Sequence, residues 1–144
     1  MLDKGRHHVY TVYRRYTHGG DAVQVHVSYS NPVPLYRQIV DQIREKVLSG
    51  ELAPGESLPS IRQLAEQAGT SVITTKRAYS ELEAEGIIVT RAGLGSFVAD
   101  LDAERLKAIR MRALRERLAE IVADARASGV TVEELLRLLK EAIG

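Results

Sequence analysis

Apolar residues recur at helical spacing soon after the thirtieth residue. The first such stretch opens at Pro34 and stops at Ser49-Gly50, and its apolar positions are Leu35, Ile39, Val40, Ile43, Val47 and Leu48. Because these positions are three or four residues apart, they form one wide stripe on a helix. Proline also suits the first turn of a helix. The pattern therefore predicts a helix that forms the inner wall of a domain.

Two shorter helices are predicted next, joined by a tight turn. Ser60 and Gln63 have the spacing of a capping box, which places the beginning of the first helix, and its inward stripe is Ile61, Leu64, Ala65 and Ala68. Gly69 suits the turn, and Ser71 is the expected cap of the second helix. That second helix is expected to bury Ala78, Tyr79 and Leu82 and to end at Gly86.

After Gly86 the pattern changes from helical to strand-like. The β-branched run 87–90 and the segment 96–98 flank a turn that contains Gly93 and Gly95, which predicts a hairpin with Arg91 at its base. Two helices and a hairpin in this order are typical of a winged helix-turn-helix domain. The leading partner predicted for residues 31–100 is therefore double-stranded DNA.

A long helical pattern follows Asp100, and its apolar positions alternate three and four residues apart. Gly129 ends this helix, and Thr131 with Glu134 forms a capping box for a second one. We predict that residues 101–144 are a two-helix dimerisation segment, because such short amphipathic helices cannot hide their apolar faces alone. The alternative is that they complete a monomeric core. The candidate dimer contacts are Met111, Leu114, Leu118, Ile121, Leu135 and Leu139.

The first thirty residues form a separate extension. Two strand-like runs, 9–16 and 22–29, flank a Gly-Gly turn, which is compatible with a β-hairpin. A loose N-terminal arm, or residues left by an upstream start, is an equally fair interpretation. In an ordered extension, Arg14 and Arg15 would be candidates for an additional DNA or dimer contact.

Composition narrows the function classes. The chain of 144 residues is 44% hydrophobic, enough for one modest core and a dimer seam. It has 20 basic and 19 acidic residues, and residues 31–100 have 7 basic against 9 acidic, a net charge of −2. A general basic surface is therefore excluded. The local distribution still favours DNA, because basic residues lie near the start of the second short helix and Glu81, Glu83 and Glu85 near its end.

Catalytic chemistry finds little support in the sequence. The chain has no cysteine, and its four histidines, His7, His8, His18 and His26, all lie in the N-terminal extension. Residues 31–100 thus lack an imidazole or thiol for nucleophilic chemistry or a usual zinc site, so we expect no enzyme activity, cofactor or metal. No apolar run is long enough to span a membrane and no secretory signal is present, so we expect a cytoplasmic protein.

The chain resembles the GntR family of bacterial transcription regulators over residues 31–100. The likeness is carried by Pro34-Leu35-Tyr36, by 58–65, by Ala78-Tyr79, Leu82-Glu83 and Glu85-Gly86, and by Gly93-Leu94-Gly95-Ser96-Phe97-Val98. Leu35-Tyr36, Arg77-Ala78-Tyr79 and the short helical tail are most similar to the YtrA subfamily. The resemblance implies a mainly α fold with a small β-wing, and a dimeric repressor.

The resemblance also implies specific DNA contacts. Arg62 matches an arginine that holds DNA, Thr74 a threonine near the phosphates, and Gly93 and Gly95 the tip of the wing. Val72 departs from the pattern, since many members have a base-reading arginine there. Valine suits a thymine methyl group and cannot form the paired hydrogen bonds that arginine gives to guanine. Lys76 also departs, since an arginine often stands there. The candidate DNA contacts are Arg62, Ser71, Val72, Thr74, Thr75, Lys76, Arg77, Arg91, Gly93 and Gly95.

Each candidate also has a purely structural interpretation. Ser71 would be a helix cap only, Val72 and Ile73 would pack inside the domain, and Arg62 would be an ordinary solvated charge. For the whole chain, the alternative to a DNA-binding regulator is a winged-helix module that binds a protein or RNA. The partners predicted are an operator DNA and a second copy of the chain. A small-molecule effector remains open, with a site at the dimer interface or between the tail and the winged domain.

Overall fold

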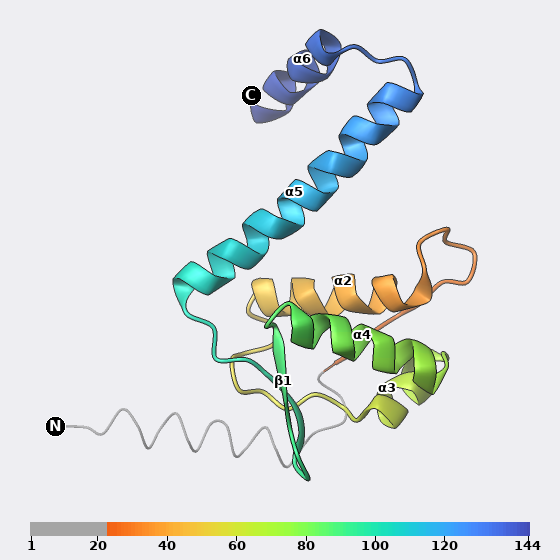
Figure 1. Ribbon diagram of the computed structural model, residues 1–144, viewed down its shortest axis with the longest axis vertical. Coiled ribbons are helices and arrows are strands. Elements are labelled where there is room, and N and C mark those ends of the chain that lie inside the picture. Colours follow the sequence, from red (N-terminus) through yellow and green to blue (C-terminus); the bar gives the residue numbers. More distant parts are fainter. Residues whose placement is uncertain (1–22) are drawn as a thin grey trace, which may run out of the picture. The chain divides into compact units, whose positions relative to one another are not determined.

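The computed structural model describes residues 23–144, and these form two compact units that divide between Asp102 and Ala103. The first unit contains the helices α2, α3 and α4 and a hairpin of β1 and β2, and the second contains α5 and α6 (Figure 1). The mainly helical fold with a two-stranded wing, predicted from the sequence, is confirmed.

The three helices of the first unit begin where their sequence signals predict. Helix α2 spans Leu35–Leu48 directly after Pro34. Helix α3 spans Ile61–Ala68, with both hydrogen bonds of the Ser60–Gln63 capping box and a left-handed Gly69 (φ 67°) at its end. Helix α4 spans Val72–Ala84, and the Ser71 side chain caps it. Helix α4 packs against both α2 and α3 (Figure 1).

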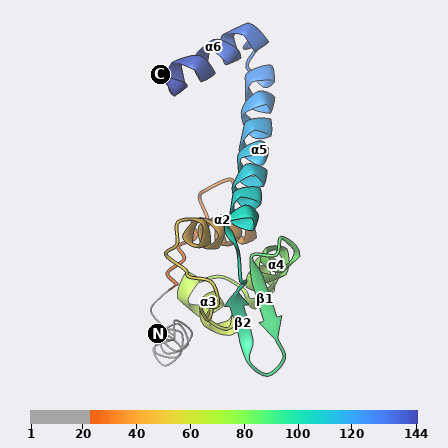
Figure 2. The same cartoon turned by 90° about the vertical axis from the view of Figure 1, so that its left-hand side faces the viewer.

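The hairpin consists of β1, Ile88–Arg91, and β2, Gly95–Val98, which pair antiparallel with Ile88 opposite Val98 and Arg91 opposite Gly95. Gly93 and Gly95 both have positive φ, 73° and 107°, so the turn depends on glycine there. The other edge of β2 bonds the segment before α3: the Leu58 amide donates to Ser96 at 2.9 Å. This second attachment holds the hairpin to the helices (Figure 2).

The core of the first unit lies between α2, α4 and the base of the hairpin. Its fully buried side chains include Ile39, Ile43, Leu64, Leu82, Ile87 and Ile88. A buried hydrogen bond joins α4 to the segment before α3. The Tyr79 hydroxyl donates to the Pro59 carbonyl at 2.6 Å, and burial raises the pKa of Tyr79 well above its usual value.

An ion pair joins α2 to the end of α4. The Arg44 guanidinium, whose side chain is 9% exposed, donates twice to the Glu85 carboxylate, at 2.6 and 3.0 Å. The Glu85 side chain is 14% exposed and is therefore not on a solvated face of the helix. Because Arg44 is 41 residues away, the charge spacing within α4 gave no sign of this partner.

Residues 23–29, the described part of the second predicted strand, are not a β-strand. Val23 and Val25 are nevertheless buried. The segment bonds side-chain amides of α2, as detailed below. The first predicted strand (9–16), the Gly-Gly turn, Arg14 and Arg15 lie outside the described residues.

The second unit consists of α5, Ala103–Ala127, and α6, Val132–Ile143. Gly129 (φ 73°) stands between them, and the predicted Thr131–Glu134 capping box is present. Neither helix has a buried residue. The apolar side chains of both helices therefore have no core within the unit to fill.

Candidate nucleic-acid interface

The first turn of α4 is held by hydrogen bonds between two of its own side chains and its backbone. The Ser71 hydroxyl oxygen accepts from the Thr74 amide at 3.1 Å and donates to the Thr74 hydroxyl at 2.8 Å. The buried side chains of α4 are Thr75, Ala78, Tyr79 and Leu82, so one face of the helix is fixed in the core while Val72 and Ile73 at its start remain exposed. The free backbone amides and the partial positive charge of such a helix start attract phosphate groups.

Two aliphatic side chains stand on the surface of this tip. Val72 is 47% exposed and Ile73 is 82% exposed. The alternative that both pack inside the domain is therefore wrong. Ile73 was missing from the predicted site, although helical spacing could have placed it: it precedes the inward position 75 by two residues and so faces away from the core.

One predicted contact requires a correction. Thr75 is completely buried, and its hydroxyl donates to the Ser71 carbonyl at 3.1 Å. Thr75 lies four residues before Tyr79 and shares its inward face, so its side chain is inaccessible to DNA. Thr75 is among the candidate DNA contacts predicted from the sequence, and the periodicity of the helix rules its side chain out.

Four basic residues lie on the elements around the tip. Lys76 and Arg62, on α4 and α3, are exposed. Arg91 ends β1 next to the turn and not at the base of the hairpin as expected, because it pairs with Gly95; its guanidinium is 5.6 Å from the centre of the Phe97 ring. Arg77 is held differently: its guanidinium stacks 3.8 Å from the centre of the Tyr36 ring and lies 3.9 Å from the Glu81 carboxylate. A phosphate that bound Arg77 would compete with these two contacts.

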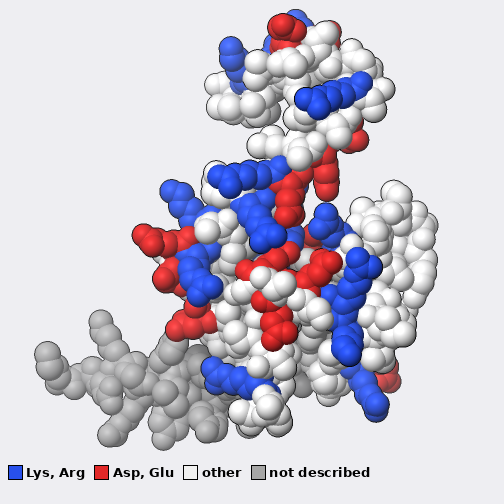
Figure 3. Space-filling model, in the orientation of Figure 1, with Lys and Arg blue, Asp and Glu red and all other residues white. Residues whose placement is uncertain are grey.

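The surface charge agrees with the count from the sequence. On the face drawn in Figure 3, basic and acidic side chains alternate, and no continuous basic area covers the first unit. Attraction to a nucleic acid would therefore be local to the tip of α4, the exposed end of α3 and the wing.

The tip of the wing presents one more apolar side chain. Leu94, between the two turn glycines, is 71% exposed, and nothing lies within 4 Å of where a side chain on Gly93 or Gly95 would begin. The glycines are therefore required by backbone conformation alone, not by crowding. Open space at this tip leaves it free to approach a groove of DNA.

Two other kinds of site are absent from the described residues. No group of three histidine, aspartate or glutamate side chains in 23–144 is placed to hold a metal ion. None of the helices described is both long and apolar enough to cross a membrane.

Comparison with known proteins decides the family. The model of the bacterial regulatory proteins of the gntR family matches residues 35–98. The HTH-type transcriptional repressor YtrA of Bacillus subtilis is 38% identical over 108 residues, which are 75% of this chain and 83% of that protein. The chain belongs to the GntR family. Its YtrA-like character, predicted from the sequence, is confirmed as well.

Solved GntR-like structures share the fold. A transcriptional antiterminator from Listeria monocytogenes EGD-e superposes with a TM-score of 0.65 at 31% identity, covering 86% of this chain and 92% of that one. A GntR-family regulator from Listeria monocytogenes gives 0.61 at 27% identity, covering 80% and 98%. The members of this family are bacterial transcription regulators.

Proposed function

We propose that this GntR protein is a homodimeric repressor that binds a palindromic operator, with α4 in the major groove and the β1–β2 wing near the minor groove. The observation that carries the proposal is the tip of α4, where exposed Val72, Ile73 and Lys76 project from a helix whose inner face is buried. A recognition helix needs this combination of a fixed base and a free tip.

The exposed side chains divide into two roles. Val72 and Ile73 are the base-reading pair, and their aliphatic groups fit the methyl group of thymine. Arg62, Lys76, Arg91 and the capped start of α4 contact phosphates and set the position of the helix in the groove. The operator should therefore depend less on guanine at the step that α4 reads than the operators of arginine-reading relatives.

The dimer is supported by the apolar faces of the second unit. On α5, Met111, Leu114, Leu118 and Ile121 are between 43% and 50% exposed, and on α6 Leu136 and Leu139 are 52% and 47% exposed. Leu135 of α6 is half-buried. Exposed rows of this length are typical of an interface between chains. A second copy of the chain is the natural partner, because a two-fold dimer presents two recognition helices to a palindrome.

The test is binding of the purified protein to the DNA upstream of its own coding sequence, followed by fluorescence anisotropy against a shuffled duplex. We expect salt-sensitive binding with two chains per site, and weaker binding for Arg62→Ala. The matched control is Lys46→Ala, which removes one positive charge away from the tip of α4. Lys46 lies on α2 two residues after Arg44, which contacts the opposite end of α4, and it forms an ion pair with Glu51.

The alternative is a winged-helix module that binds a protein. Its support is the net charge of −2 over residues 31–100 and the mixed charge in Figure 3. Equal affinity for operator and shuffled DNA at moderate salt would favour this alternative. Binding that appears only in the presence of cell extract metabolites would instead favour an effector-dependent repressor.

A further inference from the structure

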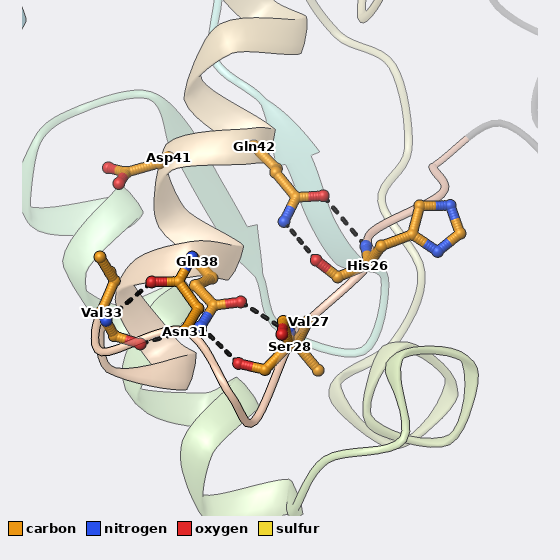
Figure 4. Close-up of a pocket in the computed structure, with 8 residues that line it drawn as sticks. All are labelled: His26, Val27, Ser28, Asn31, Val33, Gln38, Asp41 and Gln42. Carbon is orange, nitrogen blue, oxygen red and sulfur yellow. Dashed lines mark hydrogen bonds between the residues drawn. The ribbon is translucent and has the colours of Figure 1, made fainter.

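Residues 23–29, here named the N-terminal strap, are fastened to α2 by two glutamine side chains. The Gln42 amide nitrogen donates to the His26 carbonyl at 2.6 Å, and its oxygen accepts from the His26 amide at 3.0 Å. Gln38 makes the same pair of bonds with Ser28, at 3.0 and 2.8 Å, and its nitrogen also donates to the Val33 carbonyl (Figure 4). The strap therefore lies on α2 in one fixed register.

The spacing of Gln38 and Gln42 on α2 explains why both can bond the backbone of the strap. Residues four apart on a helix rise by about 6 Å, and residues two apart on an extended chain advance by about 6.6 Å. Gln38 and Gln42 are therefore spaced to meet Ser28 and His26. Each side-chain amide places an N–H donor beside a C=O acceptor, and the second N–H of Gln38 is the one that bonds Val33. Val23 and Val25, each 3% exposed, add apolar anchors before this point.

The other end of the strap reaches the helix-turn-helix. The Tyr29 hydroxyl donates to the carbonyl of Gly69 at 2.7 Å, across 40 residues of sequence. Gly69 ends α3 in the left-handed conformation, and α4 begins three residues later. Tyr29 itself is 72% exposed, so burial does not hold its ring there. The strap thus connects α2 directly to the turn that precedes the recognition helix.

We propose that the strap is a positioning element for DNA binding, and that the Tyr29 hydroxyl holds the α3–α4 turn so that the tip of α4 meets the groove in one orientation. The proposal rests on the proposed function for the use of α4. Without the bond, the turn would sample other arrangements, and the apparent dissociation constant would rise by the inverse of the competent fraction. Tyr29 is a positioning residue and does not itself contact DNA.

The test is Tyr29→Phe, which removes one hydroxyl group and leaves the ring. We expect a dissociation constant for the operator about two- to tenfold higher, the range that one hydrogen bond supports. We expect faster hydrogen exchange at the amides of Gly69 and Thr70, which donate to the carbonyls of Glu66 and Ala65. The midpoint of thermal unfolding should stay unchanged, since the ring is exposed.

Two further variants separate positioning from general stability. Ser49→Ala removes another exposed hydroxyl that donates to a backbone carbonyl, at the far end of α2. It should change neither the dissociation constant for the operator nor the hydrogen exchange at Gly69 and Thr70. Gln42→Leu loosens the strap at His26 and should weaken operator binding in the same direction as Tyr29→Phe.

The outcomes are distinct. If Tyr29→Phe leaves the dissociation constant unchanged, with or without faster exchange at Gly69, the strap is structural only and the proposal is wrong. A lowered unfolding midpoint with unchanged affinity leads to the same conclusion. Hydrogen exchange is measured without DNA, so it tests the contact even in a protein that shows no operator preference. A missing operator preference would contradict the proposed function but would not contradict the contact between Tyr29 and Gly69.

Discussion

Lys76→Ala offers a quantitative test of the interface, because Lys76 is exposed on the second turn of α4, where a phosphate contact is expected. A lysine that neutralises a phosphate releases a condensed counterion, so the logarithm of the binding constant falls with the logarithm of the salt concentration. The variant should therefore lower both the affinity and the steepness of its salt dependence.

The size of the effect follows from the proposed two-fold dimer. Each protomer contributes one Lys76, so two contacts are lost per operator, and the slope should become shallower by about 1.8. In 0.1 M monovalent salt this corresponds to about 60-fold weaker binding, and in 0.5 M to about three- to fourfold. The curves of the variant and the unmodified protein should meet near 1 M salt.

The assay is anisotropy of a labelled operator duplex at five or more salt concentrations. Lys46→Ala is the control, because it removes the same charge away from the tip of α4 and should leave the slope unchanged. Parallel lines for Lys76→Ala and the unmodified protein would refute the reasoning, since they would show that Lys76 neutralises no phosphate. A slope change of half the expected size would indicate one bound chain per site.

Three other changes test separate parts of the molecule. Leu118→Arg places a charge in the apolar row of α5 and should convert the proposed dimer to a monomer in sedimentation equilibrium, with the thermal unfolding of the first unit unaltered; a persisting dimer would exclude this row as the interface. Val72→Arg should shift the sites selected from random DNA toward guanine, and an unchanged preference would show that position 72 does not face a base. Tyr79→Phe should cost about 1–2 kcal/mol at neutral pH through the unpaired Pro59 carbonyl. Because burial raises the folded-state pKa of Tyr79 above the unfolded value of about 10, the unmodified protein should lose stability as the pH rises above 10, and denaturant titrations should show a shallower loss in the variant.

The features of the fold and of the site that the sequence predicted well are helix starts and turns. The Ser60–Gln63 and Thr131–Glu134 boxes and the glycines at 69, 93 and 95 are all present as predicted. Ile73 could have been added and Thr75 removed from the same information. Both follow from counting back along α4 from Tyr79, since Thr75 shares the inward face of Tyr79 and Ile73 does not.

The sequence by itself therefore determined the elements, their order and the family, because caps, glycine turns and apolar stripes act between residues a few positions apart. Only the tertiary structure decided which partners the polar side chains take. Glu85 pairs with Arg44, Arg77 stacks on Tyr36, and Tyr29 bonds Gly69, each across about 40 residues. Such contacts depend on how α2, α4 and the strap pack, and that packing is fixed by the shared core and not by any local pattern.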